Sequence, residues 1–273
     1  MSKITVTTIA GQTSGGDANT VKIESGDDFI VDTNVLKVDA SNNRVGMGVA
    51  SPSRQVEISR SIADGSGELA IVSSDSSTSG AFGSIHFGNN TDTSLASIRA
   101  IADGATDSGK LTFNTEKTGA AIEVAMSIDS NGRVTKPLQP AFMAYGTQSS
   151  PSSGSVLVFG TEKYDIGGNY NTSNGRFTAP VAGLYMLITT QIGSNRNTVF
   201  RFKTRLNGTN YPQTDAQMRL NPGAAIHDYG TSVILMQMAA NDYADIYFTS
   251  DDGGVGHGNS GSAHEIFSGY LVG

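Results

Sequence analysis

The sequence predicts an all-β protein, and three observations support this prediction. Gly accounts for 33 of the 273 residues and charged residues for only 16%, and Ser, Thr and Asn are frequent between short apolar segments, as in proteins with many turns. Within those segments apolar residues often occupy every second position, which is the periodicity of a strand. The sequence has no heptad pattern and no Gly-X-Y period, so we expect neither a coiled coil nor a collagen stalk.

The composition also excludes several classes of function. The formal net charge of −7 disfavours binding to phosphate backbones, so we expect no nucleic-acid partner. There is no cysteine, which removes disulfides and thiolate metal sites. The longest apolar run, around residues 233–236, is too short to cross a bilayer, so no membrane insertion is expected. Residues 1–10 lack the apolar segment of a signal peptide, so no export signal is expected either.

Residues 1–20 are polar and rich in turn-forming residues. One interpretation is a loose terminus, because chain ends are often poorly ordered. The other is an attachment segment that becomes ordered only against a larger body. We predict an attachment segment here.

Residues 21–60 contain short apolar segments separated by Gly, Asp and Asn, and we interpret them as a β-module. Residues 38–52 read VDASNNRVGMGVASP, in which Asn42 and Asn43 predict a hairpin turn because Asn tolerates a positive φ. This stretch resembles a module common in bacteriophage tail-fibre and virion-fibre proteins, with Met47 in place of an Ile. The resemblance implies a phage fibre on the virion surface, made in the host cytoplasm, whose N-terminal region docks to other virion proteins.

Residues 128–134, IDSNGRV, repeat the pattern of residues 38–45 with one residue fewer. Both stretches have a strand, an Asn-containing turn, Arg-Val and a second strand. Either the module occurs twice, or any β-hairpin of this composition looks similar. We favour two copies of the module, although two copies are too few for a solenoid.

Residues 61–135 contain several strand patterns, each with one apolar face. The apolar positions are Ile85, Phe87, Leu95, Ile98, Ile101, Leu111, Phe113, Ile122, Val124, Met126 and Ile128. These side chains are few for the length of the segment, so burying them within one chain does not clearly offset the entropy cost of ordering its backbone. Three copies around a common axis would bury them more fully. We therefore predict a trimeric β-shaft, or a small trimeric β-domain, in a homotrimeric protein.

Residues 136–140 contain Pro137 and Pro140, and two prolines so close together stiffen a connection. We therefore place a linker at residues 136–140 and a C-terminal head at residues 141–273.

The head contains a stretch, residues 165–185, that reads DIGGNYNTSNGRFTAPVAGLY. Turn residues cluster at 167–169 and 172–175. Pro180 cannot donate to a β-ladder and therefore belongs at a strand end or edge. Gly183 begins a β-favouring run, and a strand, a Pro/Gly corner and a second strand are typical of a β-sandwich.

The spacing of this stretch resembles the signature of the C1q-like, tumour-necrosis-factor-like jelly roll. The positions in register are Asp165, Gly167, Tyr170, Gly175, Phe177, Pro180, Gly183 and Tyr185. Asn171 and Leu187 stand where the family pattern has Asp and Phe. Three later stretches also resemble the family: a turn at 206–208, paired late strands within 232–247, and a closing strand at 267–271. The resemblance implies a trimeric jelly-roll head, in which the following residues fill the core or the trimer interface: Tyr170, Phe177, Pro180, Gly183, Tyr185, Phe267, Gly269 and Tyr270.

No catalytic signature is present, because the sequence lacks G-x-S-x-G, P-loop and H-E-x-x-H motifs. A glycan-degrading spike would need paired carboxylates in a cleft. Asp242 and Asp245 at a predicted strand start, and the adjacent Asp251 and Asp252, are more typical of turns. We therefore predict a protein that is not an enzyme and needs no cofactor.

Residues 250–262 are rich in Gly and Ser and form either an exposed recognition loop or a flexible connector. As a recognition loop, its candidate receptor contacts are Asp251, Asp252, His257 and Asn259. Some C1q-like heads bind calcium, and the resemblance implies that the two Asp residues could ligate Ca²⁺. Two carboxylates without a third, spaced ligand are a weak calcium signal, so we expect no metal.

Two further receptor candidates lie between residues 200 and 212. On a strand, Arg201, Lys203 and Arg205 would share one face and could contact acidic sugars of a bacterial surface. The alternative, which we favour, is a solvated outer face or ion pairs at a subunit boundary. Tyr211, beside Pro212 in a predicted polar loop, is a candidate for stacking on a sugar.

These expectations combine into a homotrimeric, non-enzymatic phage fibre whose head contacts a glycan or protein receptor on the host surface. One alternative is a purely structural head, neck or tail fibre without a receptor. A second alternative is a glycan-degrading tailspike. A third, a secreted bacterial C1q-like protein, is disfavoured by the missing export signal.

Overall fold

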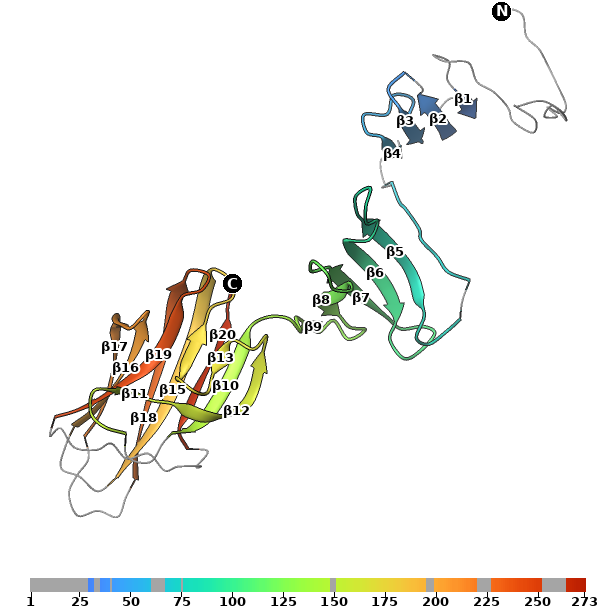
Figure 1. Ribbon diagram of the computed structural model, residues 1–273. Coiled ribbons are helices and arrows are strands. Elements are labelled where there is room, and N and C mark those ends of the chain that lie inside the picture. Colours follow the sequence, from blue (N-terminus) through green and yellow to red (C-terminus); the bar gives the residue numbers. More distant parts are fainter. Residues whose placement is uncertain are drawn as a thin grey trace, which may run out of the picture. The chain divides into compact units, whose positions relative to one another are not determined.

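In the described part of the computed structural model, the regular secondary structure is almost entirely β-strand (Figure 1), which confirms the all-β prediction. It describes residues 29–31, 35–39, 41–59, 67–74, 76–147, 151–194, 199–219, 227–251 and 264–273. The chain divides into two compact units, residues 1–73 and residues 74–273. The predicted attachment segment, residues 1–20, lies outside the described residues.

The first unit contains a four-stranded sheet with the strand order β1-β2-β3-β4. Its strands are β1 (Phe29–Val31), β2 (Leu36–Asp39), β3 (Arg44–Met47) and β4 (Val56–Ile58). The first three strands are antiparallel neighbours, whereas β4 pairs with β3 in parallel. The predicted hairpin turn therefore joins β2 to β3.

The spacing of residues 38–52 has a local physical cause. The carboxylate of Asp39 accepts the N–H of Asn42 at 3.1 Å, and Asn43 closes the turn with a φ of 52°. Arg44 donates from Nη1 to the carbonyl of Pro52 at 2.7 Å, which fixes the return of the chain toward β4. Gly48 has a φ of +75°, and a Cβ there would lie 1.9 Å from the carbonyl oxygen of Ser59. Only glycine fits such a position.

The related stretch, residues 128–134, shares the hairpin but not the parallel strand. The Asp129 carboxylate accepts the N–H groups of Asn131 at 2.9 Å and Arg133 at 2.8 Å, and Gly132 takes a positive φ of 78°. The hairpin ends in the short strand β9 (Val134–Thr135). The two stretches thus have the same Asp-capped turn, and whether they are copies of one module stays a prediction.

The second unit begins with a single five-stranded antiparallel sheet in the order β5-β6-β7-β8-β9, which we call the middle sheet. Its other strands are β5 (Ala81–Phe87), β6 (Ala96–Ala102), β7 (Gly109–Thr115) and β8 (Glu123–Ile128). Consecutive strands pair with each other throughout, so the sheet is a meander.

The clean alternation predicted for residues 122–128 is interrupted. The register shifts between Phe113 and Asn114: Phe113 pairs with Met126, and the next pair joins Asn114 to Val124. This β-bulge adds one residue to β8. Val124 therefore lies opposite a residue of the polar face, and the prediction that it shares the apolar face of Met126 is wrong.

The chain then forms a sandwich of two sheets, which we call the head. Head sheet 1 has the order β12-β10-β20-β15-β18, and head sheet 2 has the order β13-β14-β19-β16-β17, with β11 also paired to β19. The strands are β10 (Ala141–Thr147), β11 (Ser155–Val156), β12 (Phe159–Ile166), β13 (Tyr170–Asn171), β14 (Arg176–Thr178), β15 (Gly183–Ser194), β16 (Val199–Leu206), β17 (Thr209–Arg219), β18 (His227–Met238), β19 (Tyr243–Ser250) and β20 (Ile266–Leu271). The chain crosses between the two sheets several times, and among the described strands only β13–β14 and β16–β17 are consecutive strands of the same sheet; Figure 1 shows these strands in the head.

One hydrophobic core lies between the two head sheets. Its largest fully buried aromatic side chains are Phe142, Phe159, Phe177, Tyr185, Phe200, Phe248 and Phe267. The ring of Phe142 stacks on that of Phe177 with centroids 4.6 Å apart and meets Phe267 edge-on at 5.0 Å, both favourable aromatic geometries. The head therefore closes its core within one chain. The head thus does not share the shortage of apolar side chains that the sequence shows for residues 61–135.

Most of the signature residues contribute to this core. The buried ones are Tyr170, Phe177, Gly183, Tyr185, Phe267 and Gly269. A Cβ on Gly269 would lie 2.5 Å from a methyl carbon of Leu187 and 2.9 Å from a backbone oxygen, so the tight packing between β15 and β20 requires glycine. Pro180 and Tyr270 are exposed instead.

Two sequence-based placements in the head are wrong. The stretch 232–247 does not form a pair of neighbouring strands, because β18 belongs to head sheet 1 and β19 to head sheet 2. Tyr211 lies in strand β17 rather than in a polar loop, and its side chain packs against the core. In contrast, the predicted turn at 206–208 joins β16 to β17, with a positive φ of 50° at Asn207.

Candidate functional site

The outward side of head sheet 1 is apolar. Two rows of cross-strand partners contain most of the large side chains of this face. The first row is Leu235, Met186, Tyr270, Ala141 and Ile166, and the second is Val233, Ile188, Ser268, Met143 and Tyr164. Each row crosses all five strands, so the apolar side chains form a continuous surface. We call it the outer face of head sheet 1.

Several side chains of this face are strongly exposed in the single chain. Val233 is 57% exposed, Leu235 52% and Tyr270 43%. The described outward positions of β10, β15, β18 and β20 include no charged residue. A monomeric protein rarely exposes a continuous apolar surface of this kind, and such surfaces commonly mark protein interfaces.

Head sheet 2 has the opposite character on its outward side. Arg205 binds the carboxylate of the fully buried Asp245 through Nε at 2.7 Å and Nη2 at 2.9 Å, and its guanidinium lies 4.3 Å from the ring centroid of Tyr247. This hydrogen bonding with Asp245 raises the pKa of Arg205. Arg176 contributes a second cation beside Asp245 at 3.7 Å and lies 4.1 Å from the ring centroid of Tyr243.

The structure places the three residues of the predicted basic stripe on one side of a strand. Burial alternates along β16, and Arg201, Lys203 and Arg205 lie on one side of it. Arg201 forms a two-point ion pair with Asp251, and Arg205 holds Asp245 as described above. Two of its members thus form ion pairs within the chain, while ion pairs at a subunit boundary and a receptor contact by any of the three stay predictions.

The remaining receptor candidates divide between described and undescribed residues. Asp251 is exposed at the end of β19 and paired with Arg201. Asp252, His257 and Asn259 lie outside the described residues. Within the described ranges, no group of three His, Asp or Glu side chains is placed to hold a metal ion. No helix in the same ranges is long and apolar enough to cross a membrane.

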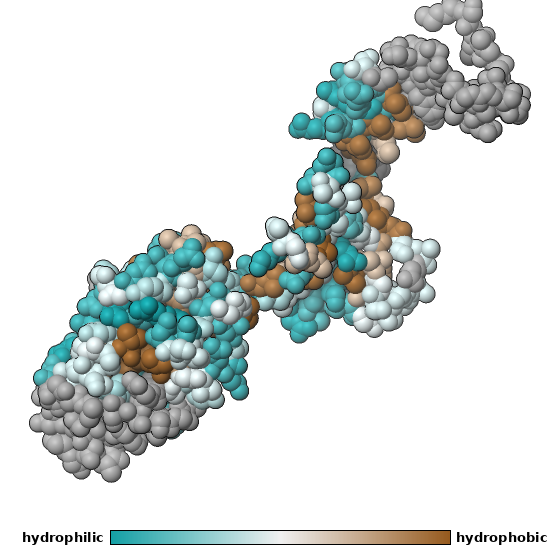
Figure 2. Space-filling model, viewed as in Figure 1, coloured by the Kyte–Doolittle hydropathy of each residue, from teal (hydrophilic) through white to brown (hydrophobic). Residues whose placement is uncertain are grey.

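The middle sheet also has one apolar side. Two rows of partners define it: Ile85, Ile98, Phe113 and Met126, and then Ala100, Leu111, Ile128 and Val134. Ile85 is 45% exposed and Val134 56%. Among the described residues of this sheet, Ala102 is the only hydrophobic residue that is buried. Figure 2 shows apolar side chains, in brown, at the surface of this segment.

On the polar side of the middle sheet, the buried Asn114 has hydrogen-bond partners, whereas the buried Nε of Arg99 has none among the described residues. Asn114 is 5% exposed, and its Nδ2 donates to Ser97 Oγ at 3.2 Å and to Thr112 Oγ1 at 3.1 Å. Buried polar groups in folded proteins normally have hydrogen-bond partners of this kind. The apolar side carries strongly exposed side chains such as Ile85, and the described residues place no second sheet against it.

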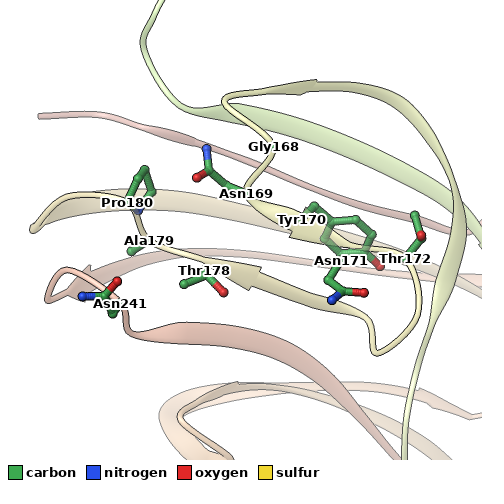
Figure 3. A pocket seen from close by; sticks show the side chains of 9 residues that line it. All are labelled: Gly168, Asn169, Tyr170, Asn171, Thr172, Thr178, Ala179, Pro180 and Asn241. Carbon is green, nitrogen blue, oxygen red and sulfur yellow. The ribbon is translucent and has the colours of Figure 1, made fainter. Parts of the chain in front are cut away.

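The head also contains a polar pocket of about 630 Å³, lined by residues of β13, β14 and the turn before β19 (Figure 3). Its polar side chains are Asn169, Asn171, Thr172, Thr178 and Asn241. Backbone hydrogen bonds hold its walls together: Thr178 N–H donates to the carbonyl of Asn169 at 2.8 Å, and Asn241 N–H to that of Ala179 at 2.8 Å. The pocket therefore exists in the free chain.

Neither the outer face of head sheet 1 nor this pocket was predicted from the sequence. A signal for the first was present, because residues 233–236 are apolar at every position, and a strand that is apolar on both sides is typically covered on both sides. No comparable signal exists for the pocket. Its Asn and Thr residues come from separated stretches and look like ordinary turn residues.

Comparison with known proteins assigns the head sequence to a family. Residues 141–272 match the C1q domain family. Similar solved structures include the globular domain of zebrafish complement 1qA protein, with a TM-score of 0.40, 14% identity and coverage of 50% of this chain and 98% of that chain. Another is Eiger TNF from S. frugiperda, with a TM-score of 0.39, 10% identity and coverage of 50% and 94%. Comparison with curated proteins gives no match.

Proposed function

We propose, given that residues 141–272 form a C1q/TNF-like domain, that the chain is a homotrimeric, non-enzymatic virion fibre of a bacteriophage whose head contacts a receptor on the host cell. C1q/TNF-like domains commonly form homotrimers. The observation that carries the proposal is the pair of uncovered apolar surfaces, one on head sheet 1 and one on the middle sheet.

The two outward sides of the head favour one orientation in such a trimer. Burial of an exposed Val or Leu side chain contributes about 1.5–3 kcal/mol, so the outer face of head sheet 1 gains by turning toward other copies. The charged side of head sheet 2, with Arg201 and Arg205, is best left at the solvent surface. Three copies would then present three identical outward surfaces, and weak contacts to a cell surface would be strengthened by multivalency.

The assignment to a virion rests on the first unit. The phage-fibre pattern of residues 38–52 forms a compact turn in which Asp39, Arg44 and Gly48 each have a structural role. A fibre also needs an attachment region, and residues 1–20 are its proposed position. Antibodies against the chain should decorate the surface of the virion that carries it, and virions without bound antibody would contradict the assignment.

A purely structural fibre is the first alternative, and it differs in one measurable outcome. If the head contacts a receptor, the purified full-length chain should bind host cells and compete with virions for adsorption. A chain that decorates the virion but neither binds cells nor slows adsorption would favour the structural role.

A glycan-degrading tailspike is the second alternative. C1q/TNF-like domains are generally non-enzymatic. In the head, Asp245 is held by two arginines, and the Asp242 carboxylate accepts hydrogen bonds from Asn207 and from the N–H of Ala239, so neither acid is arranged as half of a glycosidase pair. Release of oligosaccharide from host surface glycan by the purified chain would contradict our proposal.

The trimer itself has a direct test. A lysine at Leu235 would place an ammonium group in the proposed interface, where an unpaired charge is costly. We expect Leu235→Lys to weaken assembly in analytical ultracentrifugation, while Gln217→Lys, an exposed position on the outward side of head sheet 2, leaves assembly unchanged. A stable monomer of the unsubstituted chain at micromolar concentration would contradict the trimer.

A further inference from the structure

We propose that the polar pocket beside β13 and β14 (Figure 3) binds a neutral saccharide. This inference rests on the proposed function, because it names the class of ligand that a receptor-binding head would take. It also names a place for that ligand which differs from the basic stripe and from the loop after β19.

The pocket presents hydrogen-bonding groups that the protein does not use. The carboxamide of Asn241 and the hydroxyl of Thr178 are exposed, and neither bonds to another side chain or to the backbone within the described residues. A carboxamide places a donor and an acceptor side by side. Two adjacent sugar hydroxyls, each of which can donate and accept, match that arrangement.

In two more side chains, one end of the carboxamide is hydrogen-bonded within the protein, and this bond orients the other end. Asn171 accepts the N–H of Ser173 through Oδ1 at 2.8 Å, which leaves its two N–H donors. Asn169 donates from Nδ2 to the carbonyl of Ile166 at 3.0 Å, which leaves its Oδ1 acceptor. These bonds hold both side chains in place, so less rotamer entropy is lost when a ligand binds.

The residues that line the pocket are uncharged. It includes no Asp, Glu, Lys, Arg or His, and its one ionisable group is the phenol of Tyr170. That hydroxyl points into the core, where it donates to the carbonyl of Phe159 at 3.2 Å, and burial raises its pKa. A site that supplies only neutral amides and hydroxyls cannot compensate the lost hydration of a carboxylate, sulfate or phosphate. Its chemistry selects uncharged, hydroxyl-rich ligands.

The pocket is also preformed and of suitable size. The Asp165 carboxylate accepts the N–H groups of Asn169 at 3.0 Å and Tyr170 at 2.8 Å, which fixes the loop that forms one wall. The exposed ring of Pro180 adds an apolar surface for the C–H groups of a sugar. A volume of about 630 Å³ lies within the range of about 300–1,000 Å³ usual for small-ligand sites.

The test uses the full-length chain and defined sugars. Ligand-observed NMR would be recorded with glucose, galactose, mannose, N-acetylglucosamine and their disaccharides, and with glucuronic acid and N-acetylneuraminic acid as charged probes. We expect saturable binding of at least one neutral sugar. Its affinity should not change when ionic strength rises from about 0.01 M to about 1 M, because an uncharged contact is not screened. Binding of the acidic sugars alone, or of no sugar, would overturn the proposal.

Two substitutions locate the site without disturbing the fold. Asn241→Gly removes a carboxamide at a residue whose φ is 71°, a conformation that glycine adopts readily, and Thr178→Val removes a hydroxyl from a strand that favours β-branched residues. The matched control is Asn43→Gly, at another positive-φ Asn with a φ of 52° in the first unit. The double pocket variant should bind the neutral sugar about tenfold more weakly or worse, as expected for two lost hydrogen bonds, and the control should bind normally. Equal affinity in all three proteins would overturn the proposal.

Cell adsorption separates this inference from the proposed function. If the unsubstituted chain binds host cells and the double pocket variant binds them equally well, the saccharide site is wrong and the receptor-binding fibre stands. If the unsubstituted chain binds no cells, the proposed receptor function is wrong, and the NMR titration still decides whether the pocket takes a sugar.

Discussion

The head and the middle sheet are built from the same kind of short antiparallel strand, yet they bury their apolar side chains differently. In the head, two sheets face each other, and Phe142, Phe177 and Phe267 are fully buried between them. In the middle sheet there is one layer, and Ile85 and Phe87 remain 45% and 53% exposed. The head is thus complete as a single chain, whereas the middle sheet lacks the second layer that a sheet with an apolar face needs.

This difference separates two roles that apolar residues have in the protein. The aromatic residues of the head stabilise the fold of one copy. The apolar side of the middle sheet and the outer face of head sheet 1 have no such role in one copy, so we infer that they stabilise the assembly. The scarcity of apolar residues therefore argues for a trimer in residues 76–135 and not in the sandwich.

The largest effect is expected from a substitution in the middle sheet. Ile85→Lys places a charge in the apolar row formed with Ile98 and Phe113, where it would be buried against other copies. Beyond the lost burial of about 1.5–3 kcal/mol per copy, an unpaired ammonium group carries a further desolvation cost. We expect the trimer to dissociate at micromolar concentration, and protease to cleave residues 76–135 while the head resists.

The neighbouring residue supplies the control for that experiment. His86→Lys adds the same charge to the same strand, but at an exposed position on the other side of β5. It should leave both assembly and protease resistance unchanged. If Ile85→Lys and His86→Lys behave alike, the apolar side of the middle sheet is not an interface.

The next largest effect is expected in the core of the head. Phe177 is fully buried and stacks on Phe142, so Phe177→Ala should lower the free energy of unfolding of the head by about 3–5 kcal/mol. In calorimetry of the full chain, the head transition should move to lower temperature. The matched variant Tyr270→Ala, at a 43% exposed position of head sheet 1, should move the head transition far less and act on assembly instead. Equal shifts would contradict the separation of core from interface.

A smaller effect concerns the charged side of head sheet 2. Arg205→Ala removes the two-point contact to Asp245, which is fully buried. Loss of one partner of a buried pair typically costs about 3–5 kcal/mol, but Arg176 remains 3.7 Å from the carboxylate, so we expect about 2–3 kcal/mol in urea unfolding. Trimer formation should persist, since this side faces solvent in our proposal. If the trimer of Arg205→Ala dissociates, the interface lies on head sheet 2, which would contradict our proposal.

The smallest predicted effect depends on pH. Burial raises the pKa of Tyr170 above its usual value of about 10, so above that pH the unfolded chain loses a proton that the folded chain keeps. The contribution of Tyr170 to head stability should therefore be constant below about pH 9 and be lost as pH rises past about 10. Tyr170→Phe should cost about 1 kcal/mol at neutral pH, for the bond to Phe159, and should show a weaker alkaline loss. An identical alkaline loss in both proteins would show that Tyr170 is not responsible.

Local patterns in the sequence were sufficient to predict most of the strands. Alternation predicted the exposed and buried sides of β16, and Gly and Asn marked turns that take a positive φ, such as those at Asn43 and Asn207. These features depend only on neighbouring residues. The β-bulge opposite Phe113 was not predictable, because register is a property of two strands and not of one.

Placement of strands into sheets was also beyond the sequence pattern. β18 and β19 follow each other closely, yet they belong to opposite sheets, and Tyr211 is in a strand despite its polar neighbours and the adjacent Pro212. In the sequence, charge and loop composition indicate the receptor candidates, together with the aromatic ring of Tyr211. The structure pairs Arg201 with Asp251 and Arg205 with Asp245, and the uncharged pocket could be recognised only after β13, β14 and the turn before β19 were brought together.

Amide hydrogen exchange of the full-length chain, measured above and below the concentration at which it assembles, tests the central distinction most directly. We expect the amides of β6 and β7 to exchange slowly in the assembled protein and to lose that protection on dilution, while those of β15 and β20 remain slow at both concentrations. If β6 and β7 stay equally protected in the diluted, monomeric chain, the middle sheet is stable without other copies and our account of it is wrong.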